Sequence, residues 1–77
     1  MVLTDHEHFL LNLVKIGEGE QGLLLPDRRY REDRTLQMLC NAGLVERHPE
    51  PLGFHRYQVT AAGELQLRKM AQQKMWK

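Results

Sequence analysis

The segment Thr35–Thr60 constrains the fold of this chain more than any other part of the sequence. It begins with an apolar stripe at helical spacing, formed by Leu36, Leu39 and Cys40. Gly43 follows the stripe, and glycine readily adopts the left-handed conformation found just past a helix end. Residues 44–48 and 54–59 then flank a loop bounded by two prolines, and residues 54–59 alternate at strand period. We therefore predict a helix that ends before Gly43 and leads into an antiparallel β-hairpin.

The N-terminal region has a helix start signal. Thr4 is a favourable N-cap, and Glu7 stands three residues later, where it completes a capping box. An apolar stripe follows, formed by Phe9, Leu10, Leu13, Val14 and Ile16. We predict a first helix over residues 4–16, ended by Gly17, and a glycine-containing loop up to Gly22.

Two segments between the first helix and the hairpin allow alternatives. The apolar run 22–26 fits a short strand that pairs with the hairpin or a buried turn that enters a helix, and we favour the strand. Residues 27–34 hold four arginines and three acids around Tyr30. They form either the start of one helix over residues 26–42, or a short second helix that breaks near Asp33, where a third helix begins. After the hairpin, Thr60 is expected to cap a last helix.

The predicted core consists of the apolar residues that the helix and strand periodicities direct toward the interior. It consists of Phe9, Leu10, Leu13, Val14, Leu23, Leu25, Leu36, Leu39, Cys40, Leu44, Tyr57, Val59, Leu65 and Met70.

Length and composition limit the classes of protein to consider. The 77 residues are enough for one domain over residues 1–77, with residues 1–3 and 76–77 expected to fray. The net charge of +1 does not by itself indicate a nucleic-acid partner, so that inference must rest on where the charges lie. The single cysteine allows no disulfide within the chain. With no apolar run long enough to span a bilayer and no secretory signal, we predict a cytoplasmic protein without membrane contact.

Two short runs resemble a known family. LCNAGLVER, from Leu39 to Arg47, is similar to the end of the recognition helix and the start of the wing in winged-helix domains of bacterial and phage regulators. RYQVTAAGE, from Arg56 to Glu64, is similar to the second wing strand and the following helix start. The resemblance implies an α+β fold, a small winged helix-turn-helix domain with three to four helices and a two- or three-stranded β wing.

The same resemblance implies a DNA-binding transcription regulator, with the recognition helix in the major groove of double-stranded DNA and the wing on the backbone. Candidate contacts of the helix region are Arg28, Arg29, Arg31, Arg34 and Gln37. Candidate contacts of the wing are Arg47, His48, His55 and Arg56. Arginine suits this role because its planar guanidinium can bond a guanine edge or a phosphate through two N–H groups. The alternative is that the arginines pair with Asp27, Glu32 and Asp33 on a solvated face.

A second hypothesis comes from the near-neutral charge and the mixed arginine and acid segment. It is a stand-alone, phage-type winged-helix protein that binds and inhibits a host or defence protein complex rather than DNA. A homodimer through the C-terminal helix is also expected, with the partner interface at Leu67, Met70, Met75 and Trp76. No pattern of nucleophile and base, phosphate loop or metal-ligand spacing is present, so we predict a protein that is not an enzyme and has no metal or cofactor.

Overall fold

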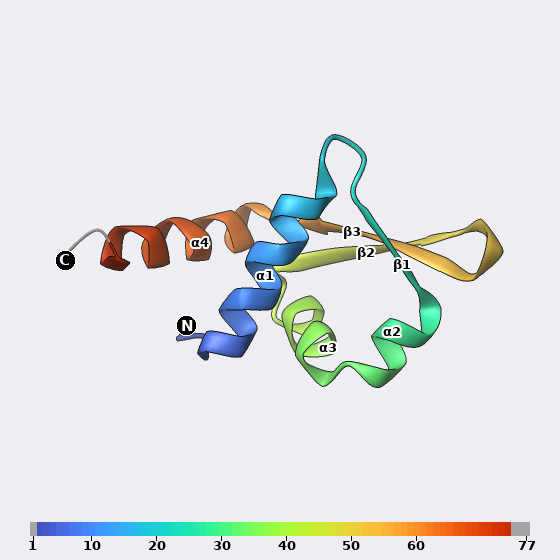
Figure 1. Cartoon of the computed structure of the whole chain (residues 1–77), viewed down its shortest axis with the longest axis horizontal. Helices are drawn as coiled ribbons and strands as arrows, with labels where there is room; N and C mark the ends of the chain where they lie inside the picture. The colour runs from blue at the N-terminus through green and yellow to red at the C-terminus, as the bar shows by residue number, and fades with distance from the viewer. Residues whose placement is uncertain (1, 75–77) are drawn as a thin grey trace.

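The computed structural model describes residues 2–74 of the chain, and the side chains of residues 2–71 (Figure 1). Its elements are, in order, α1 Asp5–Glu18, β1 Leu23–Pro26, α2 Asp27–Glu32, α3 Arg34–Asn41, β2 Val45–Glu50, the 3-10 turn η1 Pro51–Gly53, β3 Phe54–Val59 and α4 Ala61–Lys74. The four α-helices and three-stranded antiparallel sheet of this part of the chain form the predicted α+β, winged-helix-like arrangement.

The first helix begins as the sequence predicts and ends later than predicted. Thr4 and Glu7 form a reciprocal capping box: Thr4 N donates to Glu7 Oε1 over 2.9 Å and Glu7 N donates to Thr4 Oγ1 over 3.2 Å. The prediction that Gly17 ends the helix is wrong, because the helix continues to Glu18 and Gly19 terminates it with a φ of 54°. Gly17 keeps helical backbone, and a Cβ at this position would lie 3.0 Å from Leu23 Cδ1.

Asp33 resolves the alternative over residues 27–34, because it separates two helices. Its backbone N–H donates to Arg29 O and closes α2, while its carboxylate accepts from Leu36 N over 3.1 Å and caps α3. An aspartate at this position satisfies an otherwise unpaired N–H of the first turn of α3. The arrangement of a short second helix followed by a third one is therefore the correct alternative.

Gly43 ends α3 through the two hydrogen bonds of a Schellman motif. The N–H of Gly43 donates to Cys40 O and that of Leu44 donates to Leu39 O, with Gly43 at a φ of 79°. Glycine is the residue most often found in this conformation just past a helix end, because it has no Cβ. The turn directs the chain straight into β2.

The sheet has the strand order β1-β3-β2, so β3 is its central strand. The hairpin register pairs Val45 with Val59 and Glu50 with Phe54, and β1 adds the pair Leu23 with Tyr57 on the opposite side. The prediction of a strand at residues 22–26 is therefore confirmed. Since side chains alternate across a sheet, Tyr57 and Val59 face the helices while Phe54, Arg56 and Gln58 face away from them.

The core lies between α1, α3 and the inner face of the sheet. Its buried residues are Leu3, Leu10, Leu11, Val14, Leu36, Leu39, Leu44, Val45 and Tyr57. Predicted core residues that pack against this cluster while partly exposed are Leu23, Leu25, Cys40 and Val59. Tyr57 is completely buried at the centre of β3, so the sheet and the two helices share one hydrophobic contact region.

Three predicted core residues are wrong: Phe9 is 63% exposed, Leu13 45% and Leu65 49%. On α1 the buried stripe is formed by Leu10, Leu11 and Val14 instead. Both stripes of α1 have helical spacing, so periodicity alone does not decide which of them faces the core. Leu3 and Val45, at the margins of predicted elements, were missed.

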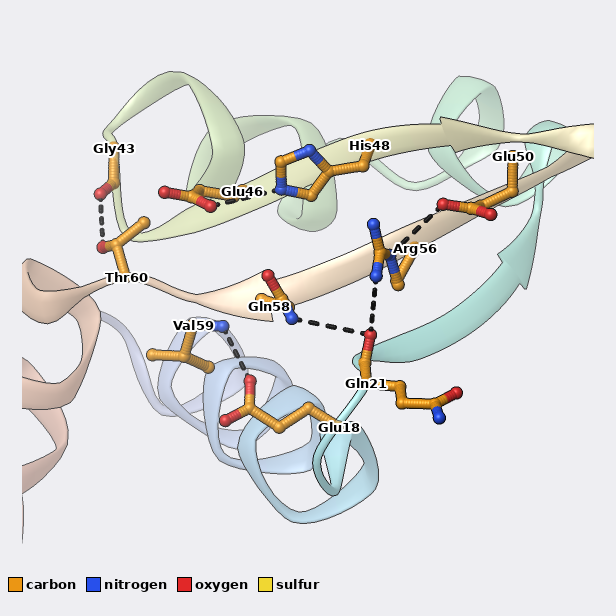
Figure 2. Close-up of polar contacts among 10 residues, drawn as sticks. All are labelled: Glu18, Gln21, Gly43, Glu46, His48, Glu50, Arg56, Gln58, Val59 and Thr60. Carbon is orange, nitrogen blue, oxygen red and sulfur yellow. Dashed lines mark hydrogen bonds and ion pairs between the residues drawn. The ribbon is translucent and has the colours of Figure 1, made fainter.

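The last helix begins against the turn that ends α3. Thr60 N donates to Leu44 O over 3.0 Å and the Thr60 hydroxyl donates to Gly43 O over 2.7 Å (Figure 2). The Thr60 hydroxyl also accepts from Gly63 N, as an N-cap does. Gly63 is buried here, and a Cβ at this position would collide with the carbonyl oxygen of Leu44 and lie 2.6 Å from Val59 Cγ1. The close approach of α4 to the α3–β2 turn therefore requires glycine.

We predict that Gly63→Ala destabilises the protein, although alanine is the better helix former. The new methyl group meets backbone that cannot move aside easily, and such overpacking costs about 1–3 kcal/mol. The control is Gly17→Ala, where the methyl group meets only a flexible leucine side chain and gains roughly 1 kcal/mol of helix propensity. Urea unfolding of both variants checks this. Equal effects of the two substitutions would contradict the packing at Gly63.

Candidate nucleic-acid interface

Four arginines lie on the two consecutive helices α2 and α3, and all four are exposed. Arg29 Nε contacts Asp33 Oδ2 over 3.1 Å, at i and i+4. The other three, Arg28, Arg31 and Arg34, form no ion pair with any residue of the described chain. These three residues are called the arginine surface below.

The two aspartates next to the arginine surface each contact another side chain of the fold, although the Asp27 side chain is 43% exposed. Asp33 caps α3 and pairs with Arg29. Burial raises the pKa of Asp33, but the hydrogen bond from Leu36 N–H and the neighbouring Arg29 outweigh it, so that the pKa lies below its ordinary value. Asp27 Oδ1 lies 2.8 Å from His55 Nδ1 on the central strand. Among the acids of this segment, only Glu32 has no such partner in the described part of the chain.

Gln37 faces the fold rather than solvent. Its side-chain amide donates to the carbonyl oxygens of Tyr30, over 2.6 Å, and Arg31, over 3.2 Å. These are two of the C-terminal carbonyls of α2 that have no partner within the helix. Gln37 therefore fixes the angle between α2 and α3, and so the placement of the arginine surface.

The wing residues proposed from the sequence all have partners within the chain. The Arg47 guanidinium stacks 3.7 Å above the centre of the Tyr30 ring, and so connects β2 to α2. His55, beside Tyr57 on the inner face, contacts Asp27. His48 Nε2 lies 3.2 Å from Glu46 Oε2, and Arg56 Nε lies 3.2 Å from Glu50 Oε2.

The outer face of the sheet carries a polar row with both signs of charge (Figure 2). The register places Glu46 opposite Gln58 and His48 opposite Arg56. Arg56 also donates to the carbonyl oxygen of Gln21 over 3.3 Å. Each arginine and histidine in residues 45–59 of the wing therefore has a partner in its own chain. The residues of the arginine surface have no ion-pair partner in the described part of the chain.

A polar connection that sequence reasoning missed holds α1 to the sheet and to α4. Glu18 Oε2 accepts from Val59 N over 2.9 Å, at a point of the central strand that β1 does not reach, because β1 begins at Leu23 opposite Tyr57 (Figure 2). Lys15 Nζ contacts Glu18 Oε1 over 3.2 Å and Glu64 Oε1 over 2.6 Å. The hydrogen bond with Glu64 raises the pKa of Lys15, and the same bond lowers the pKa of Glu64. No local pattern predicts the contacts of Glu18 with Val59 and of Lys15 with Glu64, because these partners lie more than 40 residues apart in the sequence.

The residues predicted for a partner interface on α4 have different environments. Leu67 packs against the core, and half-buried Met70 lines a hollow with Phe9 and Asn12. Met75 and Trp76 lie outside the described residues. A dimer contact through α4 stays a prediction.

Neither the partly buried Cys40 thiol nor the buried Tyr57 hydroxyl has the surroundings of a catalytic residue. Burial raises the pKa of the Cys40 thiol, and burial raises the pKa of Tyr57 to about 12. Both shifts favour the neutral, less nucleophilic form. Among residues 2–74, no three His, Cys, Asp or Glu side chains come together as a metal site would require.

Comparison of the chain with protein-family models, with curated proteins and with solved structures finds no match. Within the described residues, no helix has the length and apolar character needed to cross a membrane.

We predict that Asp33→Ala lowers the free energy of unfolding at pH 7 by about 1 kcal/mol, because α3 loses its N-cap. Asp33→Asn should cost less, since asparagine also caps. In the wild type, the stability that comes from the lowered pKa is complete above the unfolded-state pKa of about 3.9. It is lost as the pH falls through the folded-state pKa. Chemical unfolding between neutral and acid pH should therefore show a shallower acid loss for Asp33→Asn. An unchanged acid dependence would contradict the role of this carboxylate.

Proposed function

We propose that this chain binds double-stranded DNA as a winged-helix regulator, with the arginine surface on α2 and α3 as the main contact. The observation that carries the proposal is which charged side chains of residues 27–34 have partners in the fold and which do not. Asp27 and Asp33 are engaged by His55, Arg29 and the start of α3. Arg28, Arg31 and Arg34 remain exposed, against one unpaired acid, Glu32.

This division matters because phosphate contacts supply most of the non-specific affinity for DNA. Carboxylates interspersed with arginines would repel the same phosphates if they were free. Asp33 already accepts hydrogen bonds from Arg29 and from a backbone N–H, so its charge is largely balanced at short range. With Asp27 directed toward His55, residues 27–34 therefore offer more exposed positive than negative charge, even though their formal charges nearly cancel.

The wing is expected to contribute less than the arginine surface. Arg47, His48, His55 and Arg56 would have to exchange their present partners for phosphates. Gln37 supports DNA binding indirectly, since its amide holds α2 against α3. We therefore propose that α3 and the end of α2 approach the major groove and that the wing lies beside the backbone.

We predict that Arg31→Ala and Arg34→Ala each weaken binding to duplex DNA. Each substitution should also reduce the slope of log K against log salt by about 1, the change expected for one lost phosphate contact. The control is Arg68→Ala on α4, which removes the same charge from another part of the protein and should leave the slope unchanged. Fluorescence anisotropy at several salt concentrations measures these values. Salt-insensitive binding, or equal effects of all three substitutions, would contradict the proposal.

A second candidate function is protein binding through the wing. The motivating observation is Leu52 at the wing tip, which is 93% exposed and has a φ of 67°, unusual for a residue other than glycine. Leu24 and Phe54 on the outer face of the sheet are also exposed. If this function is correct, a nuclease-resistant complex with a defined partner is lost in Leu52→Asp and retained in Arg31→Ala. The reverse result would favour DNA.

A further inference from the structure

Helix α1 carries two apolar stripes, and the fold buries only one of them. Leu10, Leu11 and Val14 lie in the core. Phe9, Leu13 and Ile16 are 63%, 45% and 73% exposed, although they repeat at i, i+4 and i+7 and so share one side of the helix. Isolated exposed apolar residues are ordinary, but a continuous stripe along a helix marks an interaction surface. Phe9, Leu13 and Ile16 are called the outer stripe below.

We propose that the outer stripe binds the same stripe of a second copy of this chain, with the two α1 helices antiparallel across a two-fold axis next to Leu13. A two-fold contact requires a surface that is complementary to itself. The outer stripe meets this requirement, because an apolar residue lies four positions before Leu13 and another lies three positions after it. Each Phe9 then lies near Ile16 of the second copy.

The charges on α1 allow this homotypic contact. The one charged residue in the middle of the helix, Lys15, is engaged by Glu18 and Glu64 of its own chain, and the exposed neighbour of Leu13 is the uncharged Asn12. Like charges therefore do not meet at the centre. At the ends, the antiparallel arrangement brings exposed His6 of one copy toward exposed Glu20, in the turn after α1 of the other. These groups are complementary as hydrogen-bond donor and acceptor.

A hollow of about 410 Å³ beside Phe9 gives the second copy a place to insert a side chain. It is lined by Asp5, His8, Phe9, Asn12 and Met70, which come from both α1 and α4. In the antiparallel arrangement the large side chain that arrives next to Phe9 is Ile16 of the second copy. The lining by Met70 fits such an occupant, because methionine adapts its shape to apolar neighbours.

The size of the surface predicts a weak dimer. Helix α1 has 14 residues and is therefore about 21 Å long. One helix pair buries less than the roughly 800 Å² per partner of a standard interface, so the expected dissociation constant lies in the micromolar range. The outer stripe shares no residue with the arginine surface. Dimerisation is measured without DNA, so its failure is distinguishable from failure of the proposed function.

Sedimentation velocity of the full chain over the micromolar range tests the proposal. The wild type should shift from one copy to two as its concentration rises. Ile16→Glu should raise the dimer dissociation constant at least about tenfold, because both copies lose a central apolar contact. The matched control is Leu24→Glu, which places the same charge on another exposed aliphatic side chain, on the outer face of the sheet. A wild type that stays a single copy throughout, or equal effects of the two variants, would overturn the proposal.

Disulfide cross-linking in a Cys40→Ala background tests the antiparallel arrangement. Leu13→Cys should form a covalent dimer on oxidation, because the two-fold axis brings residue 13 of both copies together. Phe9→Cys should not, because the two residues 9 lie about 12 Å apart along the helices and a disulfide requires Cα atoms within roughly 7 Å. Equally fast cross-linking of both variants, or of neither, would overturn the two-fold contact at Leu13.

Discussion

The turn at Gly43 and Leu44 is the constraint on which the rest of the fold depends. Its left-handed glycine ends α3 and directs the chain into β2. The carbonyl oxygens of these two residues then accept both hydrogen bonds of Thr60, so that the end of β3 returns to the end of α3. Gly63 allows α4 to begin directly on this turn. One junction therefore sets the direction of the hairpin and of the last helix.

Features that depend on neighbouring residues could be predicted from the sequence. The capping box at Thr4, the glycine stop at Gly43 and the hairpin of β2 and β3 each follow from a local pattern, and the structure contains all three. The break at Asp33 was one of two alternatives, because a capping aspartate and an aspartate within a helix look alike in the sequence. The hydrogen bonds from Gln37 to the end of α2 that accompany the break become visible only in three dimensions.

Features that depend on packing could not be predicted in the same way. Helix α1 has two stripes of equal periodicity, and the choice between them depends on how α3 and the sheet meet it. Glycine is a poor helix former, yet at Gly63 the structure requires a residue without a side chain. The contact of Glu18 with Val59 depends on where β1 begins. For the candidate interface, the sequence indicated the arginines but not which of them have acidic partners.

The contacts made by the carboxylates of residues 27–34 decide which charge this segment presents to a partner. Asp33 caps α3 and pairs with Arg29, and Asp27 lies against His55 on β3, so Glu32 is the one acid of residues 27–34 without such a contact in the described chain. The wing has the opposite arrangement, because Arg56 pairs with Glu50, Arg47 stacks on Tyr30 and His48 contacts Glu46. A segment whose formal charges nearly cancel can thus present mainly positive charge to a partner.

Titration of isotopically labelled protein with a short DNA duplex, followed by two-dimensional NMR, tests the central claim most directly. The account predicts that the amide signals of residues 28–37 shift in proportion to bound DNA, while those of the outer face of the sheet, such as His48 and Gln58, change much less. Shifts confined to the wing and sheet, or no shifts at low salt, would contradict the assignment of α2 and α3 as the DNA-binding surface.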